Sequence, residues 1–270
     1  MISCFTNTNE NAIPITLVTR ENFSTWISCQ ESFLQSWLQS TQFRAEAGSV
    51  SLISGNAGKL NRVICCVNEL NSIWNIAGLP LNLPEGNYFL ENLSDAQAIG
   101  WGLGAYQFTR YKSATRKPAR LFIKENKKIN SIVESIYFVR DLINTPTENM
   151  GPTELAEAAT QLAKKYHATI SHIVGDDLLK QNFAAIHAVG RASDDAPRLI
   201  DLRWGNKNNP KITLVGKGVC FDSGGLDIKN AAGMLLMKKR YGRCCTCFRF
   251  SENDHGCRIT DLFTRTDSSS

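Results

Sequence analysis

Apolar and polar positions follow one another along the chain in two distinct patterns. Short runs rich in β-branched residues are typical of buried strands, whereas apolar residues three or four positions apart are typical of amphipathic helices. Because segments of both kinds follow one another along most of the chain, the pattern predicts an α/β fold. Strands are expected at 13–18, 49–53, 62–67, 169–174, 184–189, 198–204 and 212–215, and helices at 22–39, 94–108, 132–143 and 152–166.

A polar segment divides this pattern into two parts. Residues 124–128, KENKK, interrupt the apolar periodicity, and the helix that follows ends before the turn at 144–146, NTP. We therefore expect a small α/β domain before the break and a second α/β region after it. In the second region, Asp176 and Asp177 are interpreted as the start of a helix and not as a catalytic pair of carboxylates.

The helix expected at 94–108 has an unusual glycine content. It begins with Ser94 and Asp95, which are typical capping residues, and it carries glycine at positions 100, 102 and 104. Each glycine inside a helix costs about 1 kcal/mol relative to alanine. We therefore expect these glycines to allow close packing of the helix against the sheet, and Trp101 and Tyr106 to be core or interface residues.

A glycine-rich stretch near the end of the chain holds most of the reactive side chains. The strand expected at 212–215 breaks at Gly216, which places Lys217, Asp222 and Lys229 at or just past its carboxyl end. Open α/β sheets usually carry their sites at this edge. The sequence therefore indicates that these three side chains form the candidate site.

Three interpretations of this stretch remain open. Asp222 and a neutral Lys217 could be ligands of a metal ion, with Lys229 polarising a substrate carbonyl group. Alternatively, a lysine and Asp222 could form an ion pair that closes a tight turn. A phosphate-binding loop is the third possibility, but the glycines match neither GxxxxGK[ST] nor GxGxxG.

Residues 215–239, VGKGVCFDSGGLDIKNAAGMLLMKK, resemble the first metal-binding signature of the leucyl aminopeptidase (cytosol aminopeptidase) family. The likeness extends upstream to four shorter segments. They are DLINTP at 141–146, GPTELA at 151–156, VGRAS at 189–193 and APRLI at 196–200. Motifs of this length, in this order, are highly specific.

The resemblance implies a metal-dependent aminopeptidase that releases N-terminal amino acids from peptides. By this likeness Lys217 and Asp222 are metal ligands, Lys229 is the catalytic lysine, and two divalent ions, Mn²⁺ or Zn²⁺, are the cofactors. Family members are homo-hexamers. The implied layout is a small N-terminal α/β domain at 1–127, a joining helix at 128–146, and an incomplete α/β/α catalytic domain with a mixed central sheet at 147–239.

The family pattern stops after Lys239. Members continue with Asp-Met-Gly-Gly-Ala-Ala, whose Asp is a metal ligand, but here Arg240 stands at that position. Permitted codons for residues 240–246 restore the family motif when one base is removed, so we hypothesise a frameshift that truncates the domain. Residues 240–270 are then a tail without native structure. Because later family ligands are also missing, we expect this chain to be inactive. The alternative is a truncated pseudoenzyme or regulatory subunit that pairs with full-length homologues.

The nine cysteines do not form a recognisable metal motif. Four lie in the tail beside His255, but their spacing matches no standard pair of C-x2-C motifs. The other five cysteines are not preceded by a signal peptide, which would show a basic segment followed by an apolar run. We therefore expect these cysteines to be small buried hydrophobic residues of a reducing, cytoplasmic protein. These five cysteines are Cys4, Cys29, Cys65, Cys66 and Cys220.

Composition excludes some classes of function. The net charge of +5 is mild, and no basic run interleaved with aromatic residues supports nucleic-acid binding. No apolar stretch reaches the length that spans a membrane. The four histidines have no metal-ligand spacing, and His172 and His187 are expected within strands. The expected binding partners, peptides, follow from the resemblance to the leucyl aminopeptidase family.

Overall fold

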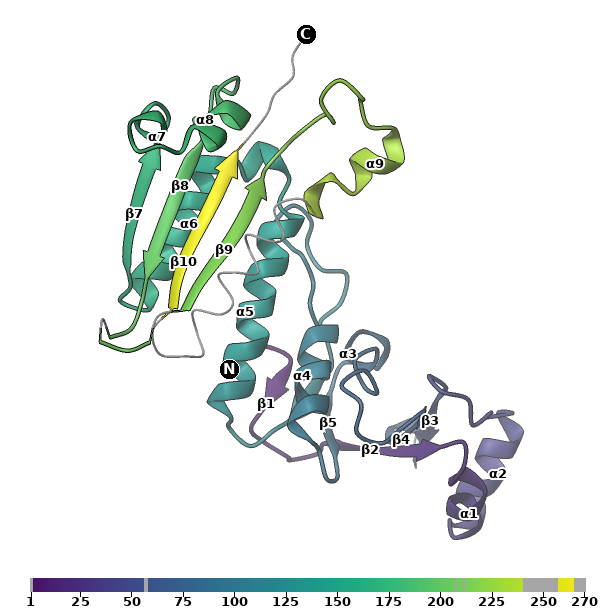
Figure 1. The fold of residues 1–270 in the computed structure, drawn as a ribbon. Helices are drawn as coiled ribbons and strands as arrows, with labels where there is room; N and C mark the ends of the chain where they lie inside the picture. Colours follow the sequence, from purple (N-terminus) through teal and green to yellow (C-terminus); the bar gives the residue numbers. More distant parts are fainter. Residues whose placement is uncertain (1, 56–57, 207, 211, 240–256, 265–270) are drawn as a thin grey trace. The chain divides into compact units, whose positions relative to one another are not determined.

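The computed structural model describes residues 2–55, 58–206, 208–210 and 212–239, and the backbone of residues 257–264. Contacts divide the chain into two units, Met1–Glu134 and Ser135–Ser270 (Figure 1). Each unit combines a mixed sheet with helices, which confirms the predicted α/β class. Among the described residues, no helix is both long and apolar enough to cross a membrane.

The N-terminal unit contains a six-stranded sheet in the order β1-β6-β5-β2-β4-β3. All neighbouring strands are parallel except β3 and β4. β2 lies between β5 and β4, where Ile13 pairs with Tyr88 and Leu17 pairs with Cys65. The strands are β1 (Phe5–Thr6), β2 (Ile13–Thr19), β3 (Val50–Ser54), β4 (Leu60–Val67), β5 (Asn87–Leu90) and β6 (Arg120–Phe122).

Four helices accompany this sheet: α1 (Phe23–Ser28), α2 (Ser32–Ser40), α3 (Leu79–Asn82) and α4 (Asp95–Gly104). α2 buries Leu34 and Leu38 against Ile53 of β3 and Ile64 of β4. Trp101 of α4 is fully buried and its indole N–H donates to the Cys4 carbonyl oxygen at 3.2 Å, so its expected core position is confirmed.

α4 begins as its sequence predicts. The Ser94 hydroxyl accepts from the backbone N–H of Gln97, and the Gln97 side chain accepts from the backbone N–H of Ser94. The glycines do allow close packing, both against the sheet, where a Cβ atom at Gly102 would lie 3.1 Å from the ring of Phe5 in β1, and against a loop. A Cβ atom at Gly100 would lie 1.7 Å from the Ile73 carbonyl oxygen, and one at Gly104 would lie 1.6 Å from that of Ala77.

The expected helix at 22–39 is interrupted. α1 ends at Ser28, and Glu31 has the extended ψ of 147° before α2 begins. The Ser28 hydroxyl donates to the Thr25 carbonyl oxygen at 2.8 Å, and such local bonds compete with the bonds of a helix. Cys29 lies in this break and is exposed, so its expected burial was wrong, whereas the other four described cysteines are buried.

The C-terminal unit contains a four-stranded sheet in the order β7-β8-β10-β9, which is mixed as expected. β8 is antiparallel to both β7 and β10, and β10 is parallel to β9. The strands are β7 (Thr169–Val174), β8 (Arg198–Arg203), β9 (Ile212–Val219) and β10 (Cys257–Thr264). The helices are α5 (Lys127–Asn144), which contains the division between the units, α6 (Pro152–Lys165), α7 (Asp177–Lys180), α8 (Ala184–Gly190) and α9 (Ala231–Leu235).

α6 supplies most of the core of this unit. Leu155 and Ala159 are fully buried, and they belong to one apolar cluster with Leu142 of α5 and Ile200 of β8.

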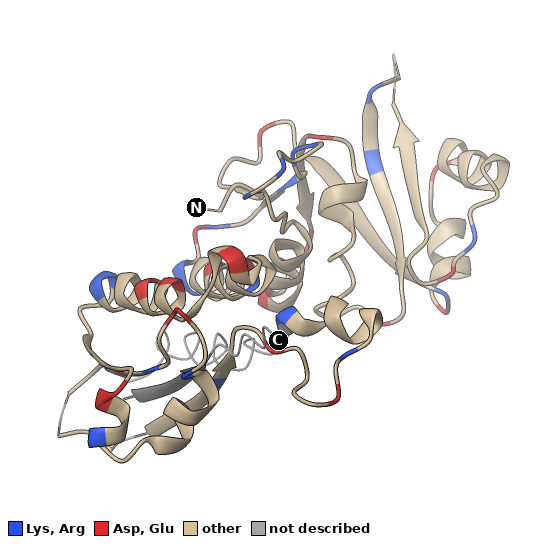
Figure 2. Cartoon of the chain, turned by 90° about the horizontal axis from the view of Figure 1, so that it is seen from above, with Lys and Arg blue, Asp and Glu red and all other residues tan. Residues whose placement is uncertain are grey.

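Lys and Arg residues are interspersed with Asp and Glu over both units (Figure 2).

Two expectations for this unit differ from the structure. The strand expected at 184–189 is the helix α8, because a short apolar run with three alanines suits a helix as well as a strand. His187 therefore lies on a helix. In the tail expected to lack native structure, residues 257–264 form β10, whose backbone fills the position between β8 and β9. The rest of the tail lies outside the described residues.

Candidate active site

The strand that leads into the site is longer than expected. β9 continues through Gly216 and ends at Val219, where the sequence predicted a loop. Glycine weakens strands but does not forbid them, and the pairing of β9 with β10 continues over these residues. Lys217 therefore lies within the strand, where it is exposed, and not in the loop after it.

The loop after β9 turns back on itself. Gly224 and Gly225 have φ of +102° and +70°, which other residues rarely adopt. A Cβ atom at Gly224 would lie only 2.5 Å from the Asp227 carbonyl oxygen. The backbone N–H of Lys229 donates to the Ser223 carbonyl oxygen at 2.9 Å, which closes the loop.

This turn brings two of the three candidate side chains together. The Lys229 ammonium group forms an ion pair with the Asp222 carboxylate, and its Nζ atom also lies 3.3 Å from the Asp222 carbonyl oxygen. Both side chains are largely buried, at 13% and 19% exposure. A carboxylate that is mostly removed from water needs a cation beside it, and Lys229 supplies one. Among the described residues, Lys217 forms no hydrogen bond or ion pair with either of them.

A segment upstream in the sequence supports the loop. The Thr147 hydroxyl donates to the carbonyl oxygen of buried Cys220 at 2.8 Å. The Lys238 ammonium group donates to the Asn144 side-chain oxygen at 3.3 Å. The motif at 141–146 therefore leads directly into a contact with the site. Sequence reasoning did not single out Thr147, although its place after that motif was a usable signal.

A second pair of motifs meets at the start of α6. Gly151 precedes the helix and has no side chain with which to cap it. The Asp195 carboxylate does so instead, since it accepts from the Thr153 backbone N–H at 2.9 Å and hydroxyl at 2.6 Å. The Arg198 guanidinium group donates to the same carboxylate at 2.8 Å. This network is structural, and it holds segments 151–156 and 196–200 together.

The donor atoms for a metal ion are few. Lys217 and Asp222 are the only candidate ligands from the sequence that lie in the described residues. No group of three or more His, Cys, Asp and Glu side chains in the described chain is arranged to hold a metal ion. Two donors do not complete a site for two ions, which usually takes several carboxylate or imidazole ligands. The described residues therefore do not fit a complete dinuclear centre.

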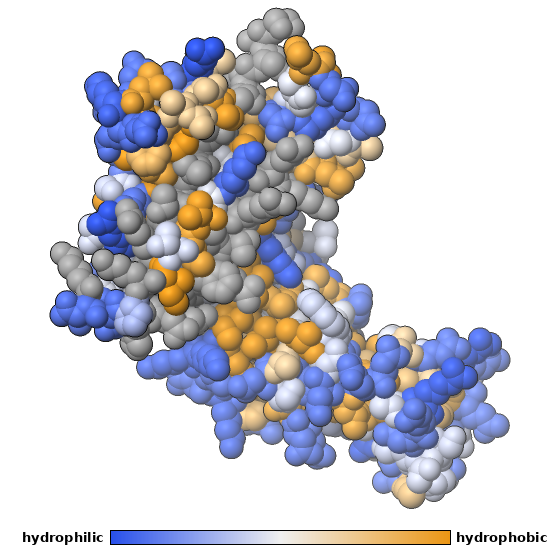
Figure 3. Space-filling model, viewed as in Figure 1, coloured by the Kyte–Doolittle hydropathy of each residue, from blue (hydrophilic) through white to orange (hydrophobic). Residues whose placement is uncertain are grey.

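Apolar side chains project from the loop and the helix that follow β9. Leu226 is fully exposed, and Ile228, Leu235 and Leu236 are also exposed. Leu235 is the last residue of α9 and the other three flank this helix, whose start is capped by Asn230; apolar groups are visible over this segment in Figure 3. Exposed apolar residues that lie this close together along the chain often mark a surface where other protein binds.

Two family models match the chain. A model described as the M17 aminopeptidase N-terminal domain matches residues 13–124. A model described as the cytosol aminopeptidase family catalytic domain matches residues 137–252, which extends past Lys239. Together the two matches span most of the sequence.

Relatives and solved structures agree with these matches. A probable cytosol aminopeptidase of Rhodococcus opacus is 36% identical over 167 residues, which are 54% of this chain and 33% of that protein. The crystal structure of a cytosol aminopeptidase from Coxiella burnetii is 36% identical with a TM-score of 0.89, and the match covers 100% of this chain and 63% of that one. A bottromycin maturation enzyme, BotP, in complex with Mn matches with a TM-score of 0.73 at 19% identity over 94% of this chain and 59% of that one, which shows the fold alone. The chain thus spans about a third of the length of the curated relative.

Proposed function

The chain belongs to the cytosol aminopeptidase family, M17, and on that premise we propose that its complete form is a metal-dependent aminopeptidase. It releases N-terminal amino acids from peptides in the cytoplasm, as a homo-hexamer. The observation that carries this proposal is the joining of Asp222 and Lys229, two family motif residues, in a largely buried pair beside the end of β9. A carboxylate and an ammonium group paired in surroundings with little water are typical of active sites.

We assign the three candidate side chains distinct roles in the complete enzyme. Lys217 and Asp222 are ligands of a divalent ion, Mn²⁺ or Zn²⁺, and Lys229 is the cation beside the reacting carbonyl group. Two bound ions would supply Lewis acidity and an activated water. A lysine in this position stabilises negative charge that develops on the carbonyl oxygen, and groups of this type contribute about 100- to 1,000-fold in rate.

We propose that the 270-residue chain itself is inactive. Its described residues supply two of the donors and no cluster of three or more acidic, His or Cys ligands. The frameshift hypothesis accounts for this, because it removes the Asp at position 240 and every ligand after it. Domain boundaries at 127 and 146 are part of the same proposal.

The first test of this proposal is made on the gene and the protein together. Sequencing across the codons for Lys238–Arg243, with the intact mass of the product, shows whether the extra base is present; the chain as given has a mass of 30.0 kDa. Hydrolysis of leucine p-nitroanilide with Mn²⁺ should be absent for the 270-residue chain and present after the frame is repaired. Activity of the 270-residue chain above that of a blank would refute the proposed inactivity.

Variants of the repaired enzyme test the assigned roles. Asp222→Asn should lower kcat/KM by at least about 100-fold, because a neutral amide is a poor metal ligand and a poor partner for Lys229. Asp227→Asn is the matched control, since Asp227 lies in the same loop and is exposed. Equal activity of the two variants would contradict the assignment of Asp222.

A second candidate function is a truncated pseudoenzyme or regulatory subunit. It is favoured by the match of the N-terminal family model to residues 13–124, a unit with its own six-stranded sheet. Such a chain would pair with full-length homologues. Co-purification of the tagged 270-residue chain with a full-length subunit, without activity of its own, would support this function, and its recovery alone would count against it.

A further inference from the structure

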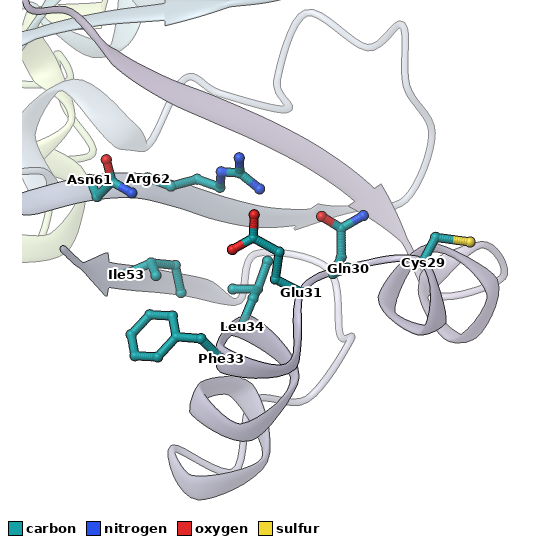
Figure 4. A pocket seen from close by; sticks show the side chains of 8 residues that line it. All are labelled: Cys29, Gln30, Glu31, Phe33, Leu34, Ile53, Asn61 and Arg62. Atoms are coloured by element: carbon teal, nitrogen blue, oxygen red, sulfur yellow. The ribbon is translucent and has the colours of Figure 1, made fainter.

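Two local irregularities of the N-terminal unit meet at one pocket. The first is the break between α1 and α2, which places Gln30 and Glu31 at the rim. The second is a β-bulge on β4. The pocket has a volume of about 310 Å³ and its lining is drawn in Figure 4. Positions where regular structure fails are often functional, so this coincidence indicates a built site.

The bulge explains why two neighbouring side chains face the same pocket. In a regular strand, successive side chains point to opposite faces. Here Ile53 pairs with Arg62 and Ser54 pairs with Leu60, so that Asn61 is an extra residue without a partner on β3. As a result, Asn61 and Arg62 both line the pocket.

The lining combines one cation, one anion and an apolar wall. The Arg62 guanidinium group and the Glu31 carboxylate project on the same side, while Phe33, Leu34 and Ile53 form the opposite wall (Figure 4). Leu34 and Ile53 are 6% and 3% exposed. Within the described part of the chain, neither charged side chain takes part in a hydrogen bond or an ion pair, although they line one pocket.

We propose that this pocket binds a free α-amino acid with an apolar side chain. The Arg62 guanidinium group binds the carboxylate of the amino acid, the Glu31 carboxylate binds its ammonium group, and the wall of Phe33, Leu34 and Ile53 receives its side chain. A volume of about 310 Å³ admits a molecule of this size. Only the choice of ligand rests on the proposed function, because an aminopeptidase releases such amino acids as its products.

Binding of L-leucine tests the proposal. Equilibrium dialysis of the full 270-residue chain is done in EDTA, so that a metal site contributes nothing. L-leucine should bind saturably, and at least about tenfold more tightly than 4-methylpentanoate or 3-methylbutylamine, which lack the ammonium and the carboxylate group respectively. The absence of saturable binding, or equal binding of the three compounds, would overturn it.

Substitutions locate the binding. Arg62→Gln and Glu31→Gln should each weaken leucine binding about tenfold. Arg20→Gln and Glu46→Gln remove the same charges at exposed positions outside the pocket and should change nothing. Asp222→Asn separates this inference from the proposed function: unchanged binding in that variant supports the pocket, whereas loss would assign leucine to the candidate active site.

Cys29 gives a second measurement that works in very dilute protein. It lies exposed at the rim, so bound leucine should slow its alkylation by iodoacetamide at least about twofold, as measured by peptide mass spectrometry. The analogue 4-methylpentanoate should not slow it, and the effect of leucine should vanish in Arg62→Gln. Protection that persists in Arg62→Gln would overturn the proposed mode of binding.

Discussion

At the scale of single residues, Cys65 and Cys66 of β4 show how the sheet of the N-terminal unit is covered. Successive residues of a strand point to opposite faces, yet both side chains are buried. Apolar structure therefore covers both faces of the sheet at this strand. Burial, together with the charge of the neighbouring Cys66, raises the pKa of the Cys65 thiol to about 11.

This raised pKa predicts a loss of stability at alkaline pH. The unfolded chain ionises Cys65 near its ordinary pKa of 9.0, whereas the folded chain does so only near 11. Stability is therefore fully present below about pH 9 and is lost as the pH rises toward 11. We expect the free energy of unfolding in urea to fall by about 2–3 kcal/mol over this range. Cys65→Val should reduce the slope, and an unchanged slope would contradict the assignment.

Burial of individual residues was predictable where a residue lies within a regular element. Cys65, Cys66 and Trp101 are buried because their strand and helix are covered, and the apolar pattern shows this. Cys29 is different, since its exposure depends on a helix break that no glycine or proline announces. Likewise, the spacing of Asp222 and Lys229 in the sequence did not decide between a metal site and an ion pair. The two side chains meet because the loop between them turns at Gly224 and Gly225, which have positive φ.

At the scale of elements, the glycines of α4 set how closely a loop can approach the helix. We predict that Gly100→Ala lowers the free energy of unfolding by about 1–3 kcal/mol or more, because its Cβ atom would meet the Ile73 carbonyl oxygen. Gly78→Ala is the control, since its Cβ atom would have no neighbour nearer than 3.9 Å and its φ of −79° suits alanine. Urea unfolding measures both, and a neutral Gly100→Ala would refute the packing argument.

The cap of α6 gives a second prediction at this scale. Asp195→Ala removes the carboxylate that accepts from Thr153 and leaves Arg198, with a largely buried side chain, without its anion. We expect a loss of about 1–3 kcal/mol in the free energy of unfolding. Asp194→Ala is the matched control, because Asp194 is the exposed neighbour. Circular dichroism in urea would show the difference, and equal stabilities would exclude the proposed cap.

Elements were predictable where local signals agree with the tertiary structure. The capping pair at α4, proline at the start of α6 and the β-branched runs of β2 and β4 are signals of this kind. α8 was mistaken for a strand because seven residues are too few for periodicity to separate the two forms. β9 was cut short because glycine is a local signal for a turn, whereas pairing along the strand decides its length.

At the scale of the whole molecule, the C-terminal unit exposes apolar residues around α9. We predict that the 270-residue chain self-associates. The triple substitution Leu226→Ser, Ile228→Ser and Leu235→Ser should lower the apparent mass in size-exclusion chromatography with light scattering. Trp74→Ser, at an exposed position of the N-terminal unit, should not. A monodisperse monomer before substitution would contradict the prediction.

The fold class, the two-part organisation and the family could be recognised from the sequence, because they depend on periodicity and on long motifs. The pocket of Glu31 and Arg62 could not. Its residues come from three separate segments and form no motif, and both a helix break and a bulge are needed to bring them together.

All the residues that line this pocket are encoded before codon 135, in the unit Met1–Glu134. A lesion in the gene after codon 239 would end selection for peptide hydrolysis but would leave selection for amino-acid binding untouched. If the lesion is old, amino-acid replacements should have accumulated faster in codons 135–239 than in codons 1–134 among closely related strains. Comparing the ratio of replacement to silent changes in the two halves of the gene would therefore date the loss of one function and reveal the survival of the other.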